Sequence, residues 1–72
     1  MELQDSLAIQ VNGEPRRIPG GLTIAGMLAE LGLDPRKVAV ERNFEIVPRS
    51  TLAEVPVADG DAFEIVHIVG GG

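Results

Sequence analysis

Apolar residues occupy alternate positions over residues 7–11, which is the period of a β-strand with one buried face. The pair Asn12-Gly13 follows, and both residues tolerate the positive φ angles of a tight hairpin turn. The returning strand is expected over residues 14–18, at an edge of the sheet because Pro15 has no amide hydrogen to donate. The chain is therefore predicted to open with a β-hairpin.

The next segment changes to the helical period. Its apolar side chains recur at helical spacing and form one stripe: Ile24, Met27, Leu28 and Leu31. Thr23 is suited to cap the start of this helix, and Gly32 is suited to end it. Gly26 lies inside the helix, where glycine costs roughly 1 kcal/mol relative to alanine. Close packing of the helix backbone against a sheet is the expected reason.

Short apolar runs in the second half predict the remaining strands. They are expected over residues 38–41, 45–47 and 62–69, with turns at residues 43–44 and 59–61. The last run is the most continuously apolar, which is typical of a central strand rather than an edge strand. A central last strand is expected to pair with the first strand.

The order of these elements predicts the fold class. One helix and strands in the order ββαββ(β) favour a two-layer α+β domain, because a single sheet buries one face against the helix. The expected arrangement is a ubiquitin-like β-grasp: a mixed sheet of four to five strands with one main helix across one face. Residues 1–69 are expected to form this single domain, and residues 70–72 a flexible C-terminal arm.

Composition narrows the function classes. The chain has 72 residues, 44% of them hydrophobic and 24% charged, which is ordinary for one small globular domain. Such a domain has little room for an enzyme pocket of usual size, so a binding or carrier module is favoured. The net charge of −5 disfavours nucleic acid as a partner. The lack of cysteine, of a signal region and of a long apolar run indicates a cytoplasmic location.

Conventional catalytic residues are sparse. His67 is the single histidine, and we expect it to be structural or part of an interface because one imidazole cannot hold a metal alone. Ser50 lacks the surroundings of a nucleophile and is expected to cap a helical turn. Residues 59–61 lack the spaced ligands of a calcium loop and are expected to be a turn. Neither a metal site nor a catalytic residue of its own is predicted.

The last predicted strand carries apolar residues on both faces. With Phe63 and Ile65 toward the helix, the alternate residues point to the open face of the sheet. Val38 or Val40 of the neighbouring strand is expected to lie beside them. An exposed apolar patch rimmed by charge favours partner docking over isolated exposed aliphatic side chains. The residues predicted to form the docking surface are Glu64, Val66, Ile68 and Val40.

Three glycines follow this strand directly: Gly70, Gly71 and Gly72. Because glycine has no Cβ, such an arm can thread a narrow channel in a partner, although a frayed tail is the alternative reading. The carboxylate of Gly72 is then the candidate reactive group. A carboxylate repels nucleophiles until it is converted to a mixed anhydride with AMP, and that conversion requires an adenylating partner.

Five segments of the chain together carry a family resemblance: residues 11–13 (VNG), 23–24 (TI), 40–43 (VERN), 46–49 (IVPR) and 60–72 (GDAFEIVHIVGGG). With these segments the chain resembles, over nearly its whole length, the ThiS sulfur carriers of thiamine biosynthesis, members of the ubiquitin-like β-grasp superfamily. The ending is the most specific of them, because two terminal glycines alone are typical of ubiquitin-like proteins in general.

The resemblance implies a carrier protein that is a substrate rather than an enzyme. An E1-like adenylyltransferase of the ThiF type would use ATP and Mg to adenylate Gly72, and a persulfide sulfur donor would convert the adenylate to a thiocarboxylate. Thiazole synthase of the ThiG type would accept the sulfur, and the chain itself would bind no cofactor. The alternatives are a small subunit of molybdopterin synthase, a ubiquitin-like protein modifier and a passive interaction domain.

Overall fold

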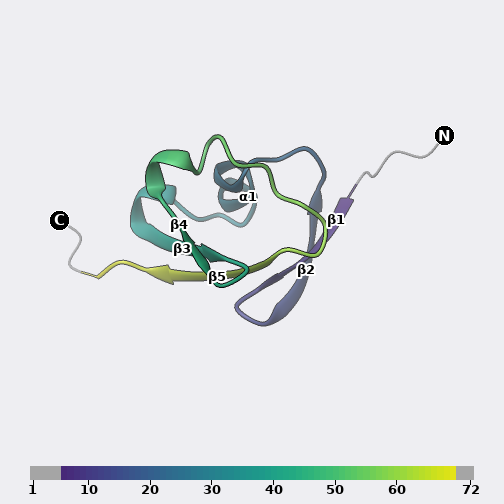
Figure 1. Ribbon diagram of the computed structural model, residues 1–72, viewed down its shortest axis with the longest axis horizontal. Coiled ribbons are helices and arrows are strands. Elements are labelled where there is room, and N and C mark those ends of the chain that lie inside the picture. Colours follow the sequence, from purple (N-terminus) through teal and green to yellow (C-terminus); the bar gives the residue numbers. More distant parts are fainter. Residues whose placement is uncertain (1–5, 70–72) are drawn as a thin grey trace.

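Five strands and one α-helix make up the fold (Figure 1), and the computed structural model describes them within residues 6–69. The strands are β1 (Ser6–Val11), β2 (Glu14–Pro19), β3 (Val38–Arg42), β4 (Glu45–Val47) and β5 (Ala62–His67). The helix α1 spans Ile24–Glu30, and two short 3-10 helices, η1 and η2, span Pro35–Lys37 and Arg49–Thr51. Within this part of the chain, no helix is long and apolar enough to cross a membrane.

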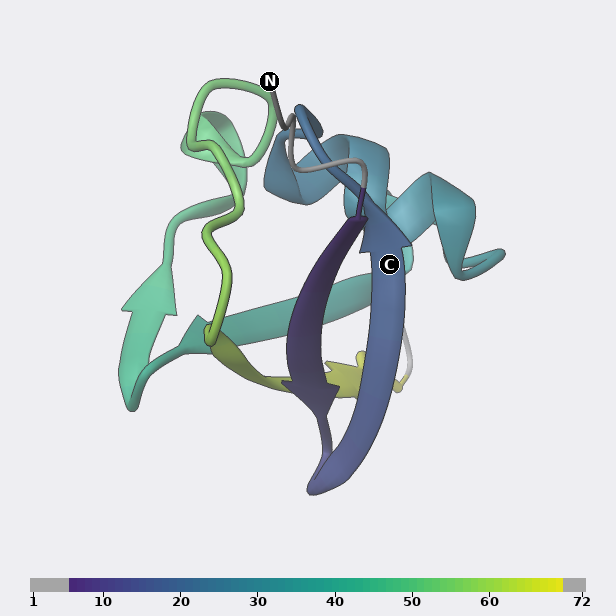
Figure 2. The ribbon, with the colours of Figure 1, turned by 90° about the vertical axis from the view of Figure 1, so that its right-hand side faces the viewer.

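The strands form one mixed sheet in the order β2-β1-β5-β3-β4. β5 lies in the centre, parallel to β1 and antiparallel to β3, whereas both hairpins are antiparallel. Figure 2 shows β1 and β2 standing beside α1 while β3 and β5 pass beneath it, so the sheet curves around the helix. The predicted α+β fold with a central last strand is confirmed.

The core lies between α1 and the concave face of the sheet. Ile24, Met27 and Leu28 of the helix have no exposed surface, because the helical period places them on one side. The remaining core side chains come mainly from alternate strand positions: Leu7, Ile9, Ile18, Val38, Val40, Leu52, Val57, Phe63 and Ile65. We call the sheet face that points away from α1 the outer face.

The helix begins where the sequence predicts. The side chain of Thr23 accepts a hydrogen bond from the backbone N–H of Gly26 at 3.2 Å, which satisfies one of the free donors of the first turn. Past the helix, Gly32 has a φ of +78°, the left-handed conformation that commonly ends helices.

The explanation expected for Gly26 is wrong. A Cβ built at this position meets its nearest atoms in Leu22 and Thr23, at 3.4–3.6 Å, and these belong to the turn before the helix rather than to the sheet. Such distances are ordinary van der Waals contacts. The position therefore has room for a methyl group.

We expect Gly26→Ala to raise the free energy of unfolding by roughly 0.5–1 kcal/mol, because alanine loses less backbone entropy on entering a helix. Urea denaturation of both proteins measures the difference. Gly32→Ala is the matched control and is expected to destabilise, since its φ of +78° strains a residue with a Cβ. A loss of stability in Gly26→Ala would show that the methyl group does not fit.

A buried carboxylate joins the β3–β4 hairpin to the start of β5. Asp61 is 6% exposed and accepts hydrogen bonds from the backbone N–H of Ala58 at 2.9 Å and from Nδ2 of Asn43 at 3.1 Å. A guanidinium nitrogen of Arg42 lies 3.6 Å from the same carboxylate. Asn43 in turn accepts from the N–H of Ala62 at 2.9 Å. The predicted turn is confirmed, and its second aspartate is a structural anchor.

Candidate functional site

The candidate site lies where β5 leaves the sheet. Of the predicted site residues, Gly70, Gly71 and Gly72 lie outside the described residues, so the arm and the domain boundary at residue 69 stay predictions. The structure describes the strand that leads to them. β5 runs through the centre of the sheet and ends at His67, two residues earlier than the predicted strand, and Val69 beyond it is 92% exposed (Figure 1).

β5 is held on both sides up to Ile65. On one side it pairs with β3, and this pairing continues beyond the strand through a 2.9 Å hydrogen bond from Ile68 N–H to the Lys37 carbonyl. On the other side β1 ends at Val11, and the side-chain amide of Asn12 takes its place. Asn12 accepts from the N–H of Ile65 at 2.8 Å and donates to its carbonyl at 3.1 Å.

The two faces of β5 differ as predicted. Phe63 and Ile65 are buried against α1, whereas Glu64 is exposed on the outer face. Val66 and Ile68 are also exposed there, at 58% and 42% of their surface. These three predicted docking residues are therefore accessible to a partner.

The predicted contribution of β3 to this surface is wrong. Val40 is 3% exposed and Val38 is 1% exposed, and both belong to the core. Val40 pairs with the buried Ile65, and residues directly opposite each other share a face of the sheet. By the same register, Ala39 is the neighbour of Val66 on the outer face.

Two exposed apolar residues that the sequence analysis did not select lie in the β3–β4 hairpin. Ile46 is 76% exposed and pairs with Glu41, which places it on the outer face. Phe44 is 90% exposed and has a φ of +72°, a strained conformation for a bulky side chain. The exposure of Ile46 could have been predicted from the two-residue turn, because a turn at Asn43-Phe44 fixes the register of β4 against β3 and places Ile46 opposite Glu41.

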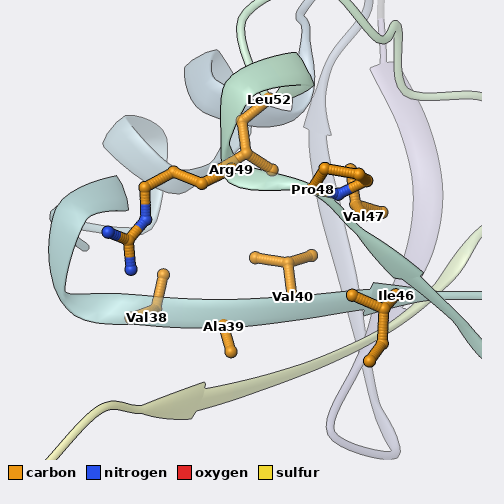
Figure 3. Close-up of a pocket in the computed structure, with 8 residues that line it drawn as sticks. All are labelled: Val38, Ala39, Val40, Ile46, Val47, Pro48, Arg49 and Leu52. Carbon is orange, nitrogen blue, oxygen red and sulfur yellow. The ribbon is translucent and has the colours of Figure 1, made fainter.

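An apolar pocket of about 190 Å³ lies at the β3–β4 edge of the sheet, below η2 (Figure 3). Arg49 is its only charged lining residue, and Figure 3 shows its side chain extending over Val38. The lining residues are Val38, Ala39, Val40, Ile46, Val47, Pro48, Arg49 and Leu52. This set contains no nucleophile and no general acid or base.

Charged groups near the end of β5 are partly paired. Asp34 accepts hydrogen bonds from the side chain of Arg36 at 3.0 and 3.2 Å and from its backbone N–H at 2.9 Å. The side-chain bond first, and the backbone bond second, lower the pKa of Asp34 to about 2. His67 is exposed opposite Val38, and its expected interface role stays a prediction. Among residues 6–69 no group of three or more His, Cys, Asp or Glu could hold a metal ion.

A curved mixed sheet around one helix, with the last strand in its centre, defines a ubiquitin-like β-grasp protein. Comparison with known families narrows this class. The model of the ThiS family matches residues 9–72, and the chain belongs to this family. The predicted resemblance is confirmed.

Individual relatives agree with this assignment. A crystal structure of the thiamine biosynthesis protein ThiS from Geobacter metallireducens matches with a TM-score of 0.77 and 33% identity, over 92% of this chain and 100% of that one. The sulfur carrier protein ThiS of Bacillus subtilis is 48% identical over 50 residues, which are 69% of this chain and 76% of that protein.

A longer relative is also similar. The thiazole synthase of Paramagnetospirillum magneticum is 53% identical over 66 residues, which are 92% of this chain. The chain spans about a fifth of the length of that protein.

Proposed function

We propose that the chain is a sulfur carrier in the synthesis of the thiazole ring of thiamine. Its reactive group is the carboxylate of Gly72, and its role is that of a substrate rather than an enzyme. The observation that carries the proposal is the position of β5, a central strand that ends at His67 and is followed by the exposed residues Ile68 and Val69 immediately before the glycines. Membership of the ThiS family, whose model extends to residue 72, supports it.

The proposed chemistry begins with activation of the carboxylate by an adenylyltransferase of the ThiF type. An oxygen of Gly72 attacks the α-phosphate of ATP, pyrophosphate leaves, and a mixed anhydride with AMP forms. The ATP and Mg belong to the partner enzyme. The anhydride removes the negative charge that protects a carboxylate from nucleophiles, so the carbonyl carbon becomes open to attack.

Sulfur enters in the next step. The terminal sulfur of a persulfide donor attacks the carbonyl carbon, and AMP leaves with the electrons of the broken C–O bond. A thiol then cleaves the resulting acyl disulfide, which leaves one sulfur on Gly72 as a thiocarboxylate and a disulfide on the donor side. Thiazole synthase of the ThiG type accepts this sulfur, a role in line with the name of the longer relative.

Partner docking is assigned to the outer face of the sheet next to β5. Val66, Ile68 and Glu64 remain in this proposal because they are exposed, and Ala39 and Ile46 replace Val40. An exposed apolar surface of this kind favours association with another protein. A cytoplasmic location belongs to the same proposal.

Intact-mass measurement tests the proposal. The protein is incubated with the adenylyltransferase of the same genome, ATP, Mg, a persulfide donor and a thiol. We expect a mass increase equal to the replacement of one oxygen by sulfur, and its complete loss when Gly72 is deleted. A wild-type protein that gains neither an adenylate nor sulfur under these conditions would contradict the carrier function.

A further inference from the structure

The outer face is apolar on only one half of the sheet. The large apolar side chains that are exposed within residues 6–69 are Phe44, Ile46, Val66, Ile68 and Val69. All of them lie on β4, on β5, in the β3–β4 turn or just after β5. Along β1 and β2 the structure describes no such residue. A partner that covers the outer face therefore contacts the β5-β3-β4 half.

Two carboxylates lie opposite each other within this half. Glu41 of β3 pairs with Glu64 of β5, and Ile46 of β4 pairs with Glu41 from the other side. The next row of the same face consists of Ala39 and Val66. Directly opposite residues have Cβ atoms about 4.5–5.5 Å apart, and like charges at such positions destabilise a sheet.

The described part of the chain does not compensate this repulsion. The neighbouring outer-face positions are occupied by Gln10, Ala39, Ile46, Ala62 and Val66, and none of these side chains is basic. The ion pairs found among residues 6–69 are Arg36 with Asp34 and Arg42 with Asp61, so neither glutamate takes part in one. The free protein therefore carries two neighbouring negative charges on an apolar surface.

We propose that Glu41 and Glu64 together receive one arginine side chain of the adenylyltransferase, an inference that rests on the proposed function. A guanidinium group is planar and has five donors, so it can bond to two neighbouring carboxylates at once. It is also more weakly hydrated than an ammonium group, so an apolar setting such as Ile46 and Val66 favours arginine over lysine. Binding relieves the repulsion between the carboxylates and selects against partners without a matching cation.

The experiment compares binding with stability in Glu41→Gln, Glu64→Gln and the double variant. Titration calorimetry gives the Kd for the adenylyltransferase of the same genome, and thermal unfolding gives the Tm. We expect the Kd of the double variant to rise at least about tenfold, because the partner's arginine loses its charged acceptors. We expect the Tm to rise by about 2 °C as the repulsion disappears. A purely structural role cannot make the protein more stable and its binding weaker.

Glu14→Gln is the matched control. Glu14 is an exposed glutamate at the start of β2, on the other half of the sheet, and its replacement removes one negative charge, as each single variant does. We expect its Kd and its Tm to stay at the wild-type values. A tenfold weakening in this variant too would show a general effect of net charge and would overturn the assignment to Glu41 and Glu64.

The remaining outcomes separate this inference from the proposed function. Sulfur loading of the wild type together with an unchanged Kd of the double variant overturns the inference alone. Weakened binding without any sulfur loading of the wild type contradicts the carrier function alone, and no binding by the wild type contradicts both. If the substitutions weaken binding to thiazole synthase but not to the adenylyltransferase, the proposed partner is wrong.

Discussion

Asp61→Ala is expected to lower the free energy of unfolding by about 3 kcal/mol, because each buried donor left without an acceptor costs about 1–3 kcal/mol. Two donors lose their acceptor in this variant: the N–H of Ala58 and the side-chain amide of Asn43. Arg42 loses a weaker partner, since its side chain is 34% exposed and solvent screens the pair. Urea denaturation followed by circular dichroism measures the loss.

Two further variants make this prediction specific. Asp61→Asn keeps the shape of the side chain but turns its NH2 group toward one of the two donors. We therefore expect this variant to lower the free energy of unfolding by about 2 kcal/mol. Asp59→Ala, two residues earlier, removes one exposed acceptor of the Ala8 N–H and is expected to cost about 1 kcal/mol. Equal effects of Asp59→Ala and Asp61→Ala would contradict an anchoring role for the buried carboxylate.

Replacement of Asn12 is expected to have the next largest effect on stability. We expect Asn12→Gly to lower the free energy of unfolding by about 2 kcal/mol. Glycine tolerates the φ of +52° at this turn position, so the variant removes the two bonds to Ile65 without straining the turn. Denaturation gives the change in stability, and hydrogen exchange of the Ile65 amide gives its local origin. We expect this amide to exchange faster.

Asn12→Asp is the companion variant. Aspartate keeps an acceptor for the Ile65 N–H, but its second oxygen faces the Ile65 carbonyl in place of a donor. We therefore expect a loss of stability smaller than that of Asn12→Gly, with the Ile65 amide still protected from hydrogen exchange. Unchanged protection of Ile65 in Asn12→Gly would show that β3 alone holds this part of β5.

The sequence was sufficient for the elements whose signals are local. The Asn12-Gly13 turn, the cap at Thr23 and the apolar stripe of α1 each depend on residues within a few positions of one another. The central place of β5 was predicted correctly from its continuous apolar run, although the structure leaves its outer face exposed. These features fixed the fold class.

The outer face could not be predicted as completely, because its composition depends on strand register. The prediction placed Val40 on the wrong face. Along β3, Val38 and Val40 alternate with Ala39 and Glu41, and the two valines are the more apolar pair and face the core. The hydrogen bond from Asn43 to Asp61 joins residues that are 18 positions apart. Both positions were predicted to lie in turns, but the contact between these turns could be seen only in the folded chain.

The central position of β5 also determines how the domain responds to mechanical force. A pull applied at Val69 acts along the strand axis, so the hydrogen bonds to β3, to β1 and to Asn12 share the load in shear. Hydrogen bonds that bear a force together resist rupture far better than hydrogen bonds that break one after another. The arrangement of β5 therefore favours a domain that keeps its fold when force acts along this strand.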